Sequence, residues 1–381
     1  MCLKYSSPAV SLSFALNFIF LLYAFVKGRL KIKDFPLKKP YCILSLMFIM
    51  GIIASSLPLI KTGPYVFDMM VSYMIVPLFF YEVRTANDYM LSLKCFLIAM
   101  FGLCSYSIVE FVLQSNPFID NAMLSIPEEW GGRLYAGNSR YGSIRTQSIM
   151  NICIGWGGLC SMIVGVLLYC KDTIQKLYRP FLYWIFLLVA IFCTLTTGTR
   201  SAYVFLVIVL MGGFYVSGSN KFAMIILGIV GFYIIGDQMS EIANSVFSSN
   251  KYEDGSSADM RQLQFAAAIE AISHSPVWGF GIKGATMASQ MYDGILGSES
   301  IWLKRLLDFG LTGVIIQIYL YYKYNMFLFH KSSKHYRFLS IAFVVGWVSF
   351  CTLTSSPGLG EPYFLIVLVL LAKSNLIKYA K

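Results

Sequence analysis

The sequence predicts an all-helical integral membrane protein: a polytopic bundle of about 11 transmembrane helices that forms a single membrane domain over residues 1–381. Two observations support this fold class. Apolar residues make up 57% of the chain and charged residues only 13%, whereas soluble domains contain about 45–50% and about 25%. The apolar residues are also grouped in runs of roughly 20, the length of a helix that spans a bilayer. An ordinary soluble enzyme is therefore excluded.

Eleven apolar runs are expected to cross the membrane. They lie at about 8–26, 41–60, 65–81, 95–113, 148–170, 180–196, 201–217, 222–236, 301–322, 338–355 and 363–379. A backbone inside hydrocarbon must satisfy its own hydrogen bonds, and these runs are apolar on all sides rather than alternating. They are therefore predicted to be helices and not barrel strands. Gly and Pro mark the expected joins at Gly63-Pro64, Gly198 and Pro357-Gly358.

The positive charges predict the orientation of the bundle. Nineteen of the 30 Lys and Arg residues lie on one alternating set of connections, and the segment 27–40 is the most basic of them. Short cytoplasmic loops are enriched in Lys and Arg, so this set is assigned to the cytoplasm. The N-terminus is then outside and the C-terminus inside. The net charge of +11 is explained by orientation, and no nucleic-acid partner is expected.

Two long connections fall on the outer face, at about 114–147 and about 237–300. The second exceeds 60 residues, well beyond the usual loop length, so we expect it to be functional. Its centre, residues 259–273, is rich in alanine and predicts a short helix with Asp259 as its N-cap. The helix is followed by Ser275-Pro276 and the glycine-rich turn VWGFGIKG.

The outer-face arginines are the candidate site residues. They come from three separated segments: Arg133, Arg140 and Arg145 in the first loop, Arg200 in the bend TTGTRSAY, and Arg261 in the second loop. Arginine grips phosphate with two hydrogen bonds and stays charged, so this set suits an anionic phosphate that is linked to a membrane lipid. Lys283 and aromatic residues such as Trp278 join the candidate substrate-binding residues. The alternative for each arginine taken singly is an anchor at the membrane surface.

Other chemistry is not indicated. No CxxC, HExxH, P-loop or DxD motif occurs, so no metal and no cofactor are expected. Asp68 and Glu110 lie within or at the ends of apolar runs. Helix-end or interhelical hydrogen bonding explains them at least as well as a catalytic role.

The chain resembles the O-antigen polymerase and ligase superfamily (Wzy-like polysaccharide polymerases) of bacterial envelope polysaccharide assembly. The resemblance is sharpest in three segments, and a fourth, RYGSIRTQSIMN, is weaker. The three segments read TLTTGTRSAYVFLVIVL, DMRQLQFAAAIEAISHSPVWGFGIKG and SESIWLKRLLDFGLTGVI. Each is unspecific alone, but their order around the largest outer loop is more specific.

The resemblance implies a metal-independent glycosyltransferase in the bacterial cytoplasmic (inner) membrane. Its substrate would be an oligosaccharide linked to undecaprenyl diphosphate, and a chain-length regulator protein would be a further partner. A polymerase moves the glycan to another lipid-linked repeat unit, and a ligase moves it to lipid A core. By family position, Arg200 and Arg261 would hold the donor diphosphate with Arg145 as a third.

One departure from the family favours a polymerase. Ligases carry a His in the segment where this chain reads Ser298-Glu299-Ser300. Glu299 is the candidate general base for the acceptor hydroxyl. The alternative is that Glu299 pairs with Lys304 or caps the following helix.

Two other classes remain open. A lipid-linked oligosaccharide flippase would need polar groups spread through the depth of the bundle, commonly in repeated halves. A membrane anchor or scaffold would tolerate loss of all the outer arginines. The product (O-antigen of lipopolysaccharide, capsule or another exopolysaccharide) is not determined by the sequence.

Overall fold

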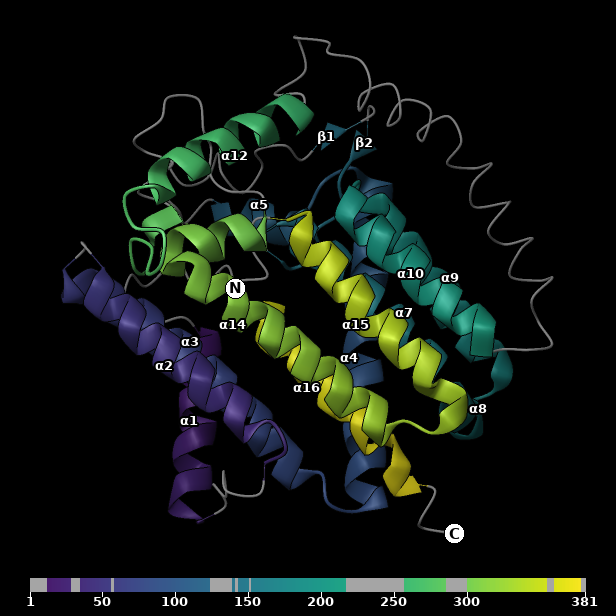
Figure 1. Cartoon of the computed structure of the whole chain (residues 1–381). Coiled ribbons are helices and arrows are strands. Elements are labelled where there is room, and N and C mark those ends of the chain that lie inside the picture. Colours follow the sequence, from purple (N-terminus) through teal and green to yellow (C-terminus); the bar gives the residue numbers. More distant parts are fainter. Residues whose placement is uncertain are drawn as a thin grey trace.

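The computed structural model describes residues 12–28, 35–55, 58–123, 139–140, 143–150, 152–216, 257–285, 300–354 and 360–377. Helices dominate this part of the chain (Figure 1). Those in the first half are α1 (Leu12–Val26), α2 (Lys38–Ala54), α3 (Leu59–Glu82), α4 (Ala86–Leu113), α5 (Pro117–Met123), α7 (Cys153–Tyr169), α8 (Lys171–Leu177) and α9 (Pro180–Thr196). The later ones are α10 (Arg200–Val216), α12 (Ser257–Ile272), α14 (Ile301–Lys331), α15 (Arg337–Thr352) and α16 (Gly360–Lys373), with 3-10 turns at Lys334–Tyr336 and Ser374–Ile377.

The prediction of an all-helical fold is confirmed, apart from one small hairpin. Strands β1 (Ser139–Arg140) and β2 (Ser143–Ile144) pair antiparallel within the first of the two long loops, which is predicted to lie outside. Among the described residues, three helices are long and apolar enough to cross a membrane: Tyr65–Glu82, Ala86–Leu113 and Gly360–Ile377. The pair α7 and α8, bent by 81°, qualifies as a fourth when it is taken as one span. The number of eleven spans stays a prediction, and the run at 222–236 lies outside the described residues.

Two expected boundaries were wrong. Helix α3 begins at Leu59, so Gly63-Pro64 lies in its second turn and not in a join. The chain turns earlier, where Pro58 takes an extended conformation as the N-cap. In the second outer loop, α12 begins at Ser257, so Asp259 lies inside the helix and is not its cap. Ser257 and Ala258 are both compatible with a helix, which accounts for the earlier start. The join at Pro357-Gly358 lies outside the described residues.

Helix α7 is the central element of the core. Fourteen of its 17 residues are buried, among them Trp156 and Ile163, and it packs against α9, α10, α15 and α16. The surrounding helices instead expose large apolar side chains such as Phe25 (72%), Val112 (72%) and Phe181 (71%). An apolar surface of this kind is suited to a hydrocarbon solvent.

Helix α14 is broken at Gly310, which has a left-handed backbone (φ 64°, ψ −160°). The break divides α14 into a short first piece, residues 301–309, and a longer second piece that continues to Lys331. The predicted span at 301–322 therefore corresponds to two helical pieces. Ser300 is the N-cap of the first piece, and its hydroxyl accepts a hydrogen bond from the backbone N–H of Trp302 at 3.3 Å.

Candidate functional site

The bend between α9 and α10 positions Arg200. Helix α9 ends at Thr196, and Gly198 takes a left-handed conformation (φ 60°) that allows the chain to reverse. Arg200 is then the first residue of α10. The bend is fixed internally, because the hydroxyl of Tyr203 donates to the carbonyl of Leu195 at 2.6 Å. Arg200 therefore stands at an internally bonded bend; the sequence predicted the bend but not these contacts.

Arg145 bonds to the same bend from the first long loop. Its Nε donates to the carbonyl oxygen of Thr197 at 2.9 Å, and its Nη2 donates to Oγ1 of Thr199 at 3.1 Å. The stem of Arg145 packs so closely on Gly198 that a Cβ there would lie 3.1 Å from the Arg145 Cγ. The structure thus brings two predicted site segments together, with Arg145 bonded to the residue that precedes Arg200.

Glu110 fixes the backbone segment that follows Arg145. Its carboxylate is 1% exposed and accepts hydrogen bonds from the backbone N–H groups of Gln147 (3.0 Å) and Ser148 (2.7 Å). The side-chain amide of Asn116 donates to the same carboxylate at 2.8 Å. A backbone hydrogen bond from Thr146 to Thr196 (3.0 Å) then ties this segment to the end of α9. Of the two interpretations for Glu110, its contacts support the hydrogen-bonding one.

The glycine-rich turn after α12 is wedged between α2 and α14. Phe280 donates its N–H to the carbonyl of Leu307 (2.8 Å), and Ile282 donates to the carbonyl of Gly51 (3.0 Å). Gly281 has φ 77°, and a Cβ at this position would lie 2.3 Å from the backbone nitrogen of Ser55. Only glycine accepts both the conformation and the close approach. The spacing of glycines in VWGFGIKG is therefore explained by backbone packing.

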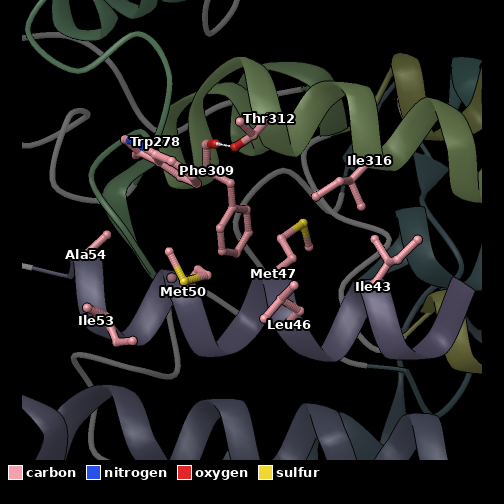
Figure 2. Close-up of a pocket in the computed structure, with 11 residues that line it drawn as sticks. Ile43, Leu46, Met47, Met50, Ile53, Ala54, Trp278, Phe309, Thr312 and Ile316 are labelled. Atoms are coloured by element: carbon pink, nitrogen blue, oxygen red, sulfur yellow. Dashed lines mark hydrogen bonds between the residues drawn. The ribbon is translucent and has the colours of Figure 1, made fainter. Parts of the chain in front are cut away.

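This turn presents two of the predicted substrate-binding residues. The side chain of Trp278 is 55% exposed and lies beside Phe309 and Thr312 of α14 (Figure 2). Lys283 is held in a left-handed conformation (φ 67°), with Nζ 5.8 Å from the ring centroid of Tyr65. Asp308 anchors the end of the turn by accepting the N–H of Ala285 at 2.9 Å. Both α12 and the hairpin lie at the top of the view in Figure 1, so the two groups of candidate residues occupy one end of the bundle.

Of the remaining candidate site residues, the structure describes the backbone of two and leaves two outside the described residues. Arg261 lies on α12 and Arg140 on β1, although their side chains are outside the described part of the structure. Arg133 and Glu299 fall in segments 124–138 and 286–299, which lie outside the described residues. The N-cap of α14 is Ser300, so the capping role considered for Glu299 is taken by its neighbour.

A buried polar network was not predicted from the sequence. Arg305 donates through Nε to Gln317 at 2.9 Å, and its Nη2 lies 3.6 Å from Oε2 of Glu361. The amide of Gln317 donates to Glu361 at 3.2 Å, and the hydroxyl of Tyr73 donates to the same carboxylate at 2.7 Å. All four side chains are nearly inaccessible, and Arg305 and Glu361 are 5% and 1% exposed.

A signal for this network was present in the sequence. Opposite charges at the edges of two apolar runs are candidates for a buried ion pair, because a charge inside a membrane protein requires a partner. Burial of Arg305 was not predicted because this residue lies in the charged segment LKRLLD, which is typical of a helix end. Burial of Glu361 was not predicted because this residue precedes the apolar run at 363–379. Helix α16 begins earlier, at Gly360.

Comparison with known families gives one match. Residues 185–318 match the sequence model of the O-antigen ligase family, and no curated protein matches the chain. This segment is similar to the O-antigen ligase family. The match confirms the resemblance to the O-antigen polymerase and ligase superfamily, and it covers about a third of the 381 residues.

The matched segment contains most of the predicted site. It runs from α9 through the second long loop into α14 and includes Arg200, Arg261, Trp278, Lys283 and Glu299. The first-loop arginines lie outside it, yet Arg145 is hydrogen-bonded to Thr197 and Thr199 within it. The chain thus combines a segment similar to the O-antigen ligase family with apolar helices that are long enough to cross a membrane.

Proposed function

We propose that the protein is a polysaccharide polymerase. It transfers a growing glycan from undecaprenyl diphosphate to a lipid-linked repeat unit at the outer face of the bacterial cytoplasmic membrane. The observation that carries the proposal is the fixed arginine corner. Arg145 is bonded to Thr197 and Thr199, and the next residue is Arg200. Two guanidinium groups on one rigid bend suit the binding of a diphosphate.

The chemistry of the transfer requires a fixed positive site. The oxygen of the acceptor hydroxyl forms a bond to the anomeric carbon, and the bond from that carbon to the diphosphate oxygen breaks. The proton of the hydroxyl passes to a general base, for which Glu299 is the candidate. Negative charge develops on the departing undecaprenyl diphosphate, and arginines held in place before the reaction stabilise it without reorganising.

Substitution of the arginines tests the proposal. Purified protein is given lipid-linked repeat units in detergent, and polymer is measured as a ladder on a gel. Arg200→Ala and Arg261→Ala are each expected to lower the rate about 100–1,000-fold, the usual effect of removing one fixed donor to a developing anion. The control is Arg84→Ala, an exposed residue next to α4 whose guanidinium donates to the nearby carbonyl of Tyr81 and whose backbone N–H donates to Asp88. Wild-type polymer from either test variant would overturn the role of that arginine.

Ligase activity is the second candidate, because the matching family carries that name. The two activities differ in the acceptor alone, so the same assay separates them. Polymer from lipid-linked repeat units without lipid A core supports the polymerase. Transfer that occurs only when lipid A core is added supports the ligase. The residues Ser298-Glu299-Ser300, where ligases carry a His, favour the first outcome.

A further inference from the structure

A half-buried lysine lies at the end of the bundle opposite the candidate site. Lys373 is the last residue of α16, and this end of the helix lies at the bottom of the view in Figure 1, whereas α12 lies at the top. Its Nζ lies 3.9 Å from the ring centroid of Phe80, in the last turn of α3. Contact with the ring removes water from the ammonium, and the attraction of the ring replaces only part of that hydration.

The charged groups that act on Lys373 make its burial less favourable. They are Lys331, the last residue of α14, and Arg84, which lies between α3 and α4, and both repel the ammonium. Arg84 is exposed and its Nε donates to the carbonyl of Tyr81 at 2.7 Å, so it adds positive potential but is not fixed beside Lys373. Among the described residues, no carboxylate lies within ion-pair distance of Lys373. The charge of this lysine is therefore not balanced by the described part of the chain.

Contacts between helix ends hold Lys331 and Lys373 near each other. The backbone carbonyl of Lys331 accepts a hydrogen bond from the side-chain amide of Asn375, two residues after Lys373. Phe327, one turn before Lys331, packs against Phe80 with ring centroids 6.5 Å apart. The end of α14 is thus joined to the ends of both α3 and α16. The two ammonium groups belong to a formed surface and not to free chain ends.

Membrane orientation explains on which side these lysines lie, but it does not explain the burial of Lys373. A lysine that serves only to orient a span can extend its ammonium into water. Lys373 instead lies against an aromatic ring among like charges. Basic pockets between transmembrane helices on the cytoplasmic side bind the head groups of anionic lipids. By the predicted orientation, this end of the bundle is the cytoplasmic one.

An apolar surface extends from the lysines along α4. The helix packs against the 3-10 turn Ser374–Ile377 that follows Lys373. On α4, Leu91 is 65% exposed and Ile98 is 66% exposed, and residues seven apart share one face of a helix. Acyl chains can lie on this face while a phosphate stays at the level of the lysines. A soluble phosphate would use the lysines alone.

We propose that Lys373 and Lys331 bind the phosphate of an anionic phospholipid of the cytoplasmic leaflet. The lipid bridges the ends of α14 and α16, and it stabilises the bundle because a ligand that binds only the folded protein raises its stability. The inference goes beyond the proposed function. This site lies at the opposite end of the bundle from the arginine bend and takes a lipid of the membrane itself.

Native mass spectrometry and thermal unfolding test the site without relying on activity. The full-length protein is purified in a neutral detergent, stripped of lipid, and titrated with phosphatidylglycerol or with phosphatidylcholine of the same acyl chains. Phosphatidylglycerol is expected to bind more tightly and to raise the unfolding temperature more. Equal binding of the two lipids would overturn the proposal, because phosphatidylcholine carries the phosphate without a net charge.

Inorganic phosphate separates a lipid site from a site for a soluble anion. It is added to the stripped protein at the same concentrations as phosphatidylglycerol. We expect it to leave the unfolding temperature nearly unchanged, because it lacks the acyl chains that lie along α4. An equal rise with inorganic phosphate would overturn the assignment to a lipid.

Substitutions of single lysines provide the matched variants. Lys373→Gln is expected to weaken phosphatidylglycerol binding about fivefold, the effect of losing one lysine next to anionic lipid. Lys373→Arg keeps the charge and should retain binding. Lys176→Gln, at an exposed position in the last turn of α8, removes the same charge from another segment predicted to be cytoplasmic and should leave binding unchanged.

The comparison of these variants decides whether the site is specific. Equal weakening by Lys373→Gln and Lys176→Gln would indicate general attraction to positive charge and would overturn the site. If Lys373→Gln fails to fold, the exposed Lys331→Gln replaces it in the same comparison.

Discussion

The guanidinium of Arg145 bonds to a carbonyl and a hydroxyl of the α9–α10 bend, and it uses separate nitrogens for the two contacts. A lysine has one nitrogen at the end of a flexible stem and cannot reproduce this paired geometry. Arg145 therefore contributes hydrogen-bond geometry as well as a positive charge near the site. It also determines the shape of the corner on which Arg200 stands.

We predict that Arg145→Lys lowers polymer formation about tenfold or more, although the charge is kept. The reason is the loss of charge-assisted hydrogen bonds, each worth about 1.5–3 kcal/mol. Polymer yield and thermal unfolding in detergent measure the effect. Arg179→Lys, at the opposite end of α9, is the control for the same exchange. Full activity of Arg145→Lys would mean that charge alone is needed at this position.

At the scale of elements, the break at Gly310 separates α14 into two pieces that need independent support. The first piece is anchored by Arg305, which reaches Gln317 on the second piece and Glu361 on α16. The ion pair thus joins three helical segments in the interior of the bundle. A buried pair of this kind contributes most when it is complete, because a lone buried charge is costly.

We predict that Glu361→Ala destabilises the protein by about 3–5 kcal/mol, because it leaves Arg305 buried without its carboxylate. The double variant Arg305→Met with Glu361→Ala is expected to be more stable than Glu361→Ala alone, because it removes the buried charge that Glu361→Ala leaves unpaired. Unfolding of the four members of the cycle in detergent measures the coupling. Additive effects of the two positions would contradict the ion pair as a stabilising unit.

At the scale of the whole molecule, the sequence predicted most helices correctly and missed contacts between them. Helix α9 agrees with the prediction at both ends, because Pro180 is favoured at a helix start and Gly198 supplies the turn. Composition could not reveal the break in α14, since its apolar content continues through Gly310.

The pairing of Arg305 with Glu361 was not predicted, because the two residues are far apart in sequence; their opposite charges at the edges of apolar runs were the signal that could have indicated it. The arginine corner was predicted in its members but not in its geometry. The contact of Arg145 with Thr197 and Thr199 depends on how the first loop folds back.

The predicted orientation is tested by reporter fusions. Green fluorescent protein joined after Lys381 is expected to fluoresce, because the positive charges place the C-terminus in the cytoplasm. Alkaline phosphatase joined after Met123, at the end of α5, should be active because that loop is expected outside. Fluorescence and phosphatase activity in whole cells are the measurements. The reverse pattern would invert the assignment of both long loops.

The carboxylate of Glu110 has a consequence for engineering chimeric enzymes. It sits at the end of α4 yet fixes the backbone at Gln147 and Ser148, and through it the placement of Arg145. A first loop grafted from a relative would therefore lack the carboxylate of Glu110 that fixes its backbone. The end of α4 and Asn116 would have to be exchanged with the loop. A transplant that runs from Glu110 to Tyr203 would keep these contacts together with Arg200 and the bond that fixes its bend.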